Sequence, residues 1–201
     1  MRALSWILSA IALLTMMPPV AAHAQSRRPT QAEVISSCES CHGLGGRTQS
    51  AAVPRLNGQT REYLVARLKD LRIGTNQTAS AIHAMLGPAR GVSDADLNVL
   101  ADHFASQPAT VPAPGGRGRE AGAQLYARGD GARLPSCASC HGDSGQGIGG
   151  APRLAGQHAS YLIDQMEALM LTARIQSGMN RHARLLTAAE IRNLAAFLAN
   201  D

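Results

Sequence analysis

The sequence predicts an all-α protein in which one small helical unit is used twice. A short stretch, SCESCHG at 37–43, recurs as SCASCHG at 136–142. Apolar residues elsewhere are spaced by three and four, and no alternating run of strand length appears. A segment rich in Pro and Gly separates the two copies. These observations indicate two equivalent helical units joined by a linker.

The repeat extends well beyond the cysteines. VPRLNGQTREYLVARL at 53–68 aligns with APRLAGQHASYLIDQM at 151–166, and VSDADLNVLADHFAS at 92–106 aligns with LTAAEIRNLAAFLAN at 186–200. Capping-box patterns predict helix starts at 30–33, 93–96 and 187–190. Helical spacing of apolar residues is found over 61–71, 119–129 and 160–171.

The N-terminus has the pattern of a secretory signal peptide. Arg2 precedes a short apolar run, and small residues stand at Ala22 and Ala24, where a signal peptidase cuts. A retained membrane anchor is the alternative, but the run is shorter than the ~20 residues of a spanning helix. We expect a signal peptide at 1–24, an N-terminal domain at 25–107, a linker at 108–118 and a C-terminal domain at 119–201.

The composition and charge of the chain argue for some classes of function and against others. The formal charge is +5, but the basic residues form no run and are not interleaved with aromatic residues, which argues against nucleic-acid binding. A mildly basic surface suits docking on an acidic protein partner. Aromatic residues make up only 3% of the chain, so two small units would have thin cores unless something else fills them.

Every cysteine of the chain lies in the two Cys-x-x-Cys-His motifs. A zinc site would draw four ligands from one unit, and a thioredoxin-like redox pair would need a strand–helix setting. Cys-x-x-Cys-His is the signature of covalent haem attachment, in which the thiols bond to the haem and the His ligates iron. The sequence therefore predicts two haem c groups, which would also fill the thin cores. The expected attachment residues are Cys38, Cys41, Cys137 and Cys140, and the expected iron ligands are His42 and His141.

A haem iron held by one His needs a second ligand to be closed to small molecules, and Met suits electron transfer. Met85 and Met179 stand at matching positions before the capped helices, in segments expected to be loops. Ordinary packing is the alternative for both. Met166 and Met170 share a predicted helical face with leucines, so we expect them to pack in the core.

Three further pairs recur in the repeat and have two interpretations each. Proline carbonyls in a fixed turn can accept the second N–H of a metal-bound His, or the prolines only start a helix. The arginines can pair with haem propionates or face solvent, and the tyrosines can pack on the haem edge or on the helices. These pairs are Pro54 and Pro152, Arg55 and Arg153, and Tyr63 and Tyr161.

These motifs together are similar to those of the dihaem cytochrome c4 family, over residues 30–200. The resemblance implies two class I cytochrome c domains face to face, and periplasmic electron transfer. It also implies the axial pairs His42–Met85 and His141–Met179. The second repeat is four residues shorter between its Tyr and its Met than the first, so the potentials of the two haems are expected to differ.

The leading functional hypothesis is an electron carrier between a quinol-oxidising complex and a terminal oxidase, with redox proteins as partners. Docking on a membrane complex fits this hypothesis, and no small-molecule substrate is expected. The first alternative is a haem subunit of a periplasmic dehydrogenase, such as one paired with a sulfide-oxidising flavoprotein. The second is a dihaem enzyme such as a peroxidase or a thiosulfate dehydrogenase.

Overall fold

The computed structural model describes residues 27–74, 80–171 and 178–200. These ranges hold helices and loops, with two isolated bridges and no strand, so the all-α prediction is confirmed. None of the helices found there is long and apolar enough to cross a membrane. The predicted signal peptide lies outside the described residues.

The N-terminal half precedes the linker and is built around α4. It contains α1 (Gln31–His42), the 3-10 turn η1 (Leu44–Gly46), α2 (Arg61–Ile73), α3 (Ser80–Arg90) and α4 (Asp94–Ala105). Helix α4 packs against α1 and α2, and α2 packs against α3. Leu64, Leu100, Ala101 and Phe104 form the buried centre. This core is small, and one Phe is its only aromatic ring among the described residues.

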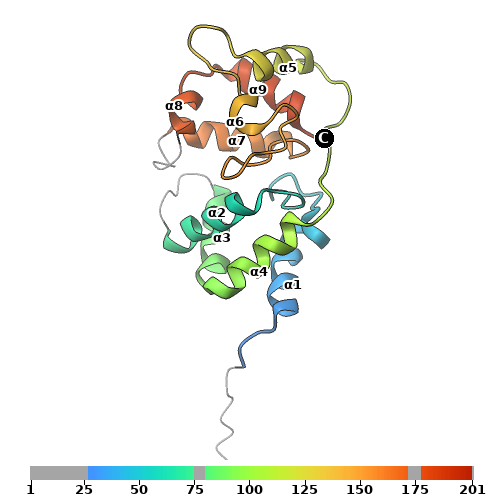
Figure 1. Cartoon of the computed structure of the whole chain (residues 1–201), viewed down its shortest axis with the longest axis vertical. Helices are drawn as coiled ribbons and strands as arrows, with labels where there is room; N and C mark the ends of the chain where they lie inside the picture. The colour runs from blue at the N-terminus through green and yellow to red at the C-terminus, as the bar shows by residue number, and fades with distance from the viewer. Residues whose placement is uncertain (1–26, 75–79, 172–177, 201) are drawn as a thin grey trace, which may run out of the picture.

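The C-terminal half repeats this arrangement around α9. It contains α5 (Arg119–Arg128), α6 (Ala138–His141), α7 (Ala159–Met170), α8 (Met179–Ala183) and α9 (Ala188–Leu198). Helix α9 packs against α5 and α7, and α7 packs against α8. The core residue Tyr126 tilts against Phe197, with ring centroids 5.3 Å apart. The two halves lie one above the other, with the linker running along one side (Figure 1).

The expected helix starts are present. Thr30 and Thr187 each form a full capping box, with Glu33 and Glu190 respectively, and the Ser93 side chain accepts the N–H of Asp96. The segments before α4 and α9 were expected to be loops, and this was wrong. Each contains a helix, α3 or α8. Helix α3 contains Gly87 and Pro88, a pair that normally ends helices, and α8 is too short to show a periodic pattern.

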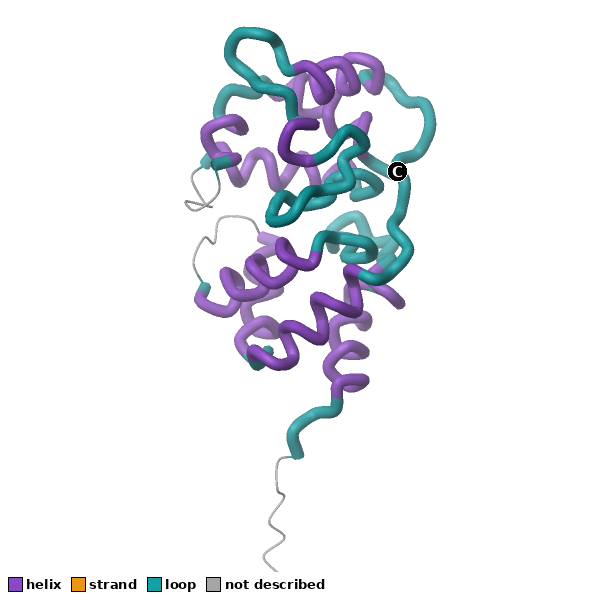
Figure 2. Tube along the Cα trace, viewed as in Figure 1, coloured by secondary structure: helices purple, strands orange, loops and turns teal. Residues whose placement is uncertain are grey.

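The linker is packed against both halves, which its composition did not indicate. Loops rather than helices form much of the region where the halves face each other (Figure 2). A Cβ atom on Gly58 would lie 2.5 Å from the Cβ of Ala109, and one on Gly156 would lie 2.0 Å from the Thr110 oxygen. Glycine at these two positions therefore lets the linker pass close to both halves.

Replacing Gly156 with Ala should destabilise the protein by about 2–4 kcal/mol, because left-handed backbone and a backbone clash both oppose the new Cβ. Gly115→Ala is the matched control. It has nearly the same φ, +82° against +80°, and no atom lies within 4 Å of the place that its new Cβ would take. The control should cost only about 1 kcal/mol. Urea unfolding of the holoprotein measures the loss of unfolding free energy in both variants. Equal losses would show that the linker does not contact Gly156 closely.

Candidate functional site

Each half presents its two cysteines and its His in one turn of helix. Cys38, Cys41 and His42 form the end of α1, whereas Cys137 caps the short α6 that ends at His141. The four thiols make no disulfide; the first Cys of each motif is half-buried and the second is exposed. One thiol at the core and one at the surface suit attachment to a flat group that lies half inside the fold.

Both histidines are buried and held in the same way. His42 is 4% exposed and its Nδ1 lies 2.8 Å from the Pro54 oxygen; His141 is 8% exposed and its Nδ1 lies 2.9 Å from the Pro152 oxygen. A carbonyl oxygen only accepts, so Nδ1 must carry the proton in both rings. The lone pair at Nε2 is then left for a metal ion, as in other metal-binding histidines.

The protonation state of the two imidazoles also suits metal ligation. Burial lowers the pKa of both rings, and the hydrogen bond to the proline carbonyl raises it by less. Both rings therefore stay in the neutral form that ligates metals. Burial likewise raises the pKa of the Cys38 and Cys137 thiols.

The methionines of the two halves are half-buried and lie on equivalent elements. Met85 lies in α3 and packs against Leu71 and Ala89, and Met179 is the first residue of α8. Met166 and Met170 pack against the core of the C-terminal half, as predicted. The part of the chain that the structure describes contains no cluster of three or more His, Cys, Asp or Glu side chains that would suit a zinc ion.

The surroundings of the two motifs differ. In the N-terminal half, a Glu39 oxygen lies 3.0 Å from Nε2 of His103 and accepts the N–H of Gly45 at 2.8 Å. The aligned residues in the C-terminal half are Ala138 and Phe197, which carry no charge. Neither Glu39 nor His103 stands out in the sequence, because neither recurs in the repeat. The Glu39–His103 pair lies beside the first motif and has no counterpart at the second, which supports the expectation that the two sites differ in potential.

Comparison with known proteins gives a consistent result. The Cytochrome c family model matches residues 119–200. Cytochrome c4 of Azotobacter vinelandii is 35% identical over 88% of this chain and 88% of its own length. A thiosulfate dehydrogenase electron acceptor of Stutzerimonas stutzeri is 31% identical over 100% of this chain and 96% of its own length. The cytochrome c4 structure from Acidithiobacillus ferrooxidans superposes with a TM-score of 0.74, at 33% identity, over 82% of this chain and 98% of that one.

The chain belongs to the cytochrome c4 family. It is therefore a tandem pair of class I cytochrome c domains with two covalently bound haem c groups, attached through the two Cys-x-x-Cys-His motifs. Its function is that of a dihaem electron carrier, since its relatives are electron-transfer cytochromes or electron acceptors rather than catalysts. The residues present fit this cofactor, because each half has two free thiols and a neutral His with an available Nε2.

The two predicted arginines lie at the boundary between the halves. Arg55 is 7% exposed, and its guanidinium donates to the Gly156 and Thr48 oxygens at 2.8 and 3.3 Å. Arg153 is partly buried and donates to the Thr110 and Ala155 oxygens, both at 3.0 Å. Burial lowers the pKa of Arg153. Both arginines thus place positive charge inside the boundary. Tyr63 and Tyr161 are half-buried on α2 and α7.

Proposed function

We propose that this protein carries electrons in the periplasm from a quinol-oxidising complex to a terminal oxidase. His42 and Met85 would ligate one haem iron, and His141 and Met179 the other. The observation that carries this proposal is the pair of buried histidines, each with Nδ1 on a proline carbonyl and Nε2 free. When bound, a His/Met-ligated haem c exchanges one electron at a raised potential.

The residues of the chain support a carrier rather than an open catalytic centre. The proline carbonyls fix the orientation of both imidazoles, so little rearrangement follows a change in charge at the iron. Met85 and Met179 lie on α3 and α8, which pack against α2 and α7, and would close the haem face opposite the histidine. The guanidinium groups of the buried Arg55 and the partly buried Arg153 would offset the negative charge of haem propionates.

The proposed location and partners follow from the sequence as well. Residues 1–24 would direct export and be removed after Ala24. The mildly basic chain, with a formal charge of +5, would dock on acidic surfaces of membrane-bound redox complexes. Such docking is transient and sensitive to ionic strength.

Stopped-flow kinetics with the two purified membrane complexes tests this route. We expect the quinol-oxidising complex to reduce both haems and the terminal oxidase to reoxidise them, with rates that fall as salt rises. No electron exchange with either complex, under conditions in which a control cytochrome reacts, would contradict the proposed route.

A second candidate is the role of electron acceptor for a periplasmic dehydrogenase. The full-length similarity to a thiosulfate dehydrogenase electron acceptor favours it. This candidate predicts a stable complex with a dehydrogenase when the native protein is purified, and reduction only by that enzyme and its substrate. Size-exclusion chromatography of the native protein, with identification of co-eluting subunits, separates the two roles.

A further inference from the structure

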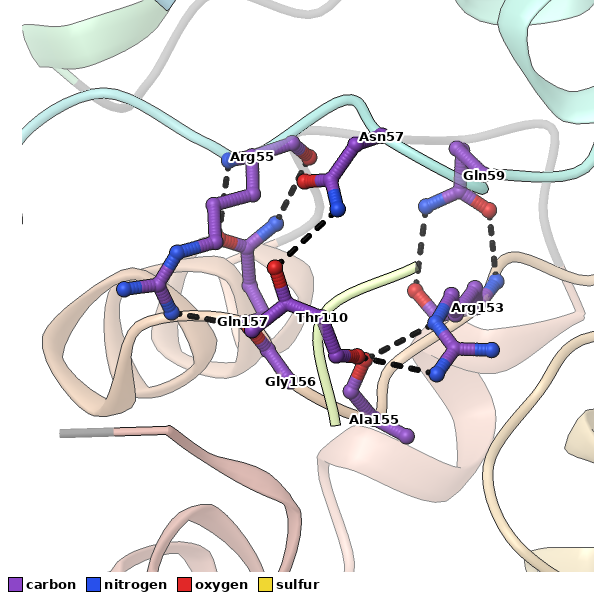
Figure 3. Close-up of a pocket in the computed structure, with 8 residues that line it drawn as sticks. All are labelled: Arg55, Asn57, Gln59, Thr110, Arg153, Ala155, Gly156 and Gln157. Atoms are coloured by element: carbon purple, nitrogen blue, oxygen red, sulfur yellow. Dashed lines mark hydrogen bonds between the residues drawn. The ribbon is translucent and has the colours of Figure 1, made fainter. Parts of the chain in front are cut away.

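Two glutamines join the halves of the molecule by four hydrogen bonds to backbone. The Gln157 side chain accepts the N–H of Arg55 at 3.0 Å and donates to the Arg55 oxygen at 3.1 Å. The Gln59 side chain accepts the N–H of Arg153 at 2.6 Å and donates to the Arg153 oxygen at 3.0 Å. Figure 3 shows both pairs side by side. We call these two side chains, with the two arginine backbones, the glutamine clamp.

The clamp has approximate two-fold symmetry, because Gln59 aligns with Gln157 and Arg55 aligns with Arg153 in the repeat. Each half therefore gives one carboxamide and receives the other, as in an isologous interface. A carboxamide that pairs with both the N–H and the C=O of one residue fixes the register, since a slip in either direction breaks both bonds. The linker joins this boundary on one side, where the Asn57 amide donates to the Pro108 oxygen at 2.8 Å.

Both carboxamides are buried and are themselves held in place. Gln59 is 8% exposed and Gln157 is 7% exposed. The oxygen of each also accepts the N–H of the residue that follows it, Thr60 at 2.9 Å and His158 at 3.0 Å. Water therefore cannot readily replace a lost partner, and an unmade bond leaves a buried polar group unsatisfied.

In each half, one peptide group connects the glutamine clamp to the histidine. The carbonyl of Pro54, which accepts Nδ1–H of His42, belongs to the same peptide unit as the Arg55 N–H that Gln157 accepts. In the other half, Pro152 and Arg153 connect His141 to Gln59 in the same way. The C=O and N–H of a peptide are coupled by resonance. A bond accepted from the N–H makes the carbonyl oxygen more negative and strengthens its bond to the imidazole.

We propose that Gln157 and Gln59 are positioning residues that act crosswise, each orienting and polarising the iron-ligating His of the opposite half during electron transfer between the two haem sites. The inference rests on the proposed axial roles of His42 and His141. Because a stronger hydrogen bond at Nδ1 raises the basicity of a ligating His, the clamp lowers the potential of each haem from the far side of the boundary.

The test uses Gln157→Met and Gln59→Met in the holoprotein. Each keeps side-chain volume and removes both hydrogen bonds to the arginine backbone, together with the one accepted from the following N–H. In a haem-resolved redox titration, Gln157→Met should shift the potential of the N-terminal haem upward, and Gln59→Met that of the C-terminal haem. The Arg55 amide should exchange with solvent about tenfold faster in Gln157→Met, and the Arg153 amide about tenfold faster in Gln59→Met. Gln124→Met is the control, because Gln124 is exposed on α5 and its amide donates to Glu120 of the same helix.

A shift confined to the haem of the mutated half, equal shifts in both haems, or no shift would each overturn the proposal. Where a Met variant does not fold, Gln157→Glu is used instead, because it keeps the acceptor oxygen. The Arg55 amide should then stay protected from exchange, and the potential of the N-terminal haem should fall by more than that of the C-terminal haem. A larger fall at the C-terminal haem would overturn the proposal. The absorption spectra of the same samples report axial ligation separately. If the potentials do not shift as expected but the spectra show His/Met ligation, the crosswise role of the glutamines is wrong and the electron-carrier proposal stands. Spectra without His/Met ligation in the unmutated protein would contradict the electron-carrier proposal itself.

Discussion

Replacing Met179 with Ala should turn the C-terminal haem iron of the reduced protein into a high-spin centre that binds carbon monoxide. In the proposed ligation, loss of the thioether would leave the iron with His141 alone, and about half of the haem in the sample should respond. The potential of that haem should fall by on the order of 0.1 V or more, because axial ligands tune haem potentials over a wide range. Carbon monoxide difference spectra and a redox titration measure both effects.

Met166→Ala is the matched control, since Met166 packs against the core of the same half. It should lower stability by about 1–3 kcal/mol, because Met166 is only partly buried, and leave the haem spectrum unchanged. Met85→Ala should open the N-terminal haem and leave the C-terminal one closed. If the spectrum of Met179→Ala matches that of the unmutated protein, another side chain ligates the second iron.

Replacing Cys137 and Cys140 together with Ala should remove one haem and unfold the C-terminal half. This half has few aromatic residues to fill its centre, and Cys137 already packs against the core cluster. Loss of the cofactor removes folding free energy in the way that loss of a structural metal does. A loss of several kcal/mol is enough to unfold a domain whose total stability is ~5–15 kcal/mol.

Ser139→Ala is the control for this variant. Ser139 lies between the two cysteines, and its hydroxyl donates to the Ser136 oxygen and contacts the Cys140 sulfur. Mass spectrometry should find one haem in the double Cys variant and two in Ser139→Ala, and circular dichroism should show helix loss only in the first. Two haems retained in the double Cys variant would refute attachment at this motif.

The sequence predicted the parts of this fold that depend on local chemistry. The caps at Thr30, Ser93 and Thr187 place three helix starts, and the repeat places the two histidines beside their prolines. The helix around Met85 was not predicted because Gly87 and Pro88 are residues typical of loops. It forms because α3 packs against α2, which is a tertiary effect that local propensity does not include.

The contacts between the two halves were the part of the structure least predictable from the sequence. The repeat showed that Gln59 and Gln157 recur, but a carboxamide acquires a role only from the group placed opposite it. That placement depends on how two separately folded units meet. A linker rich in Pro and Gly does not by itself predict packing contacts, yet Ala109 lies close to Gly58 and Thr110 lies close to Gly156.

The intact mass of protein purified from a host that attaches haem c tests covalent attachment of two haems most directly. We expect one species whose mass equals the chain after cleavage at Ala24 plus two haems, both retained under denaturing conditions because the bonds are covalent. A mass equal to the polypeptide alone, or to the polypeptide plus a single haem, would contradict it.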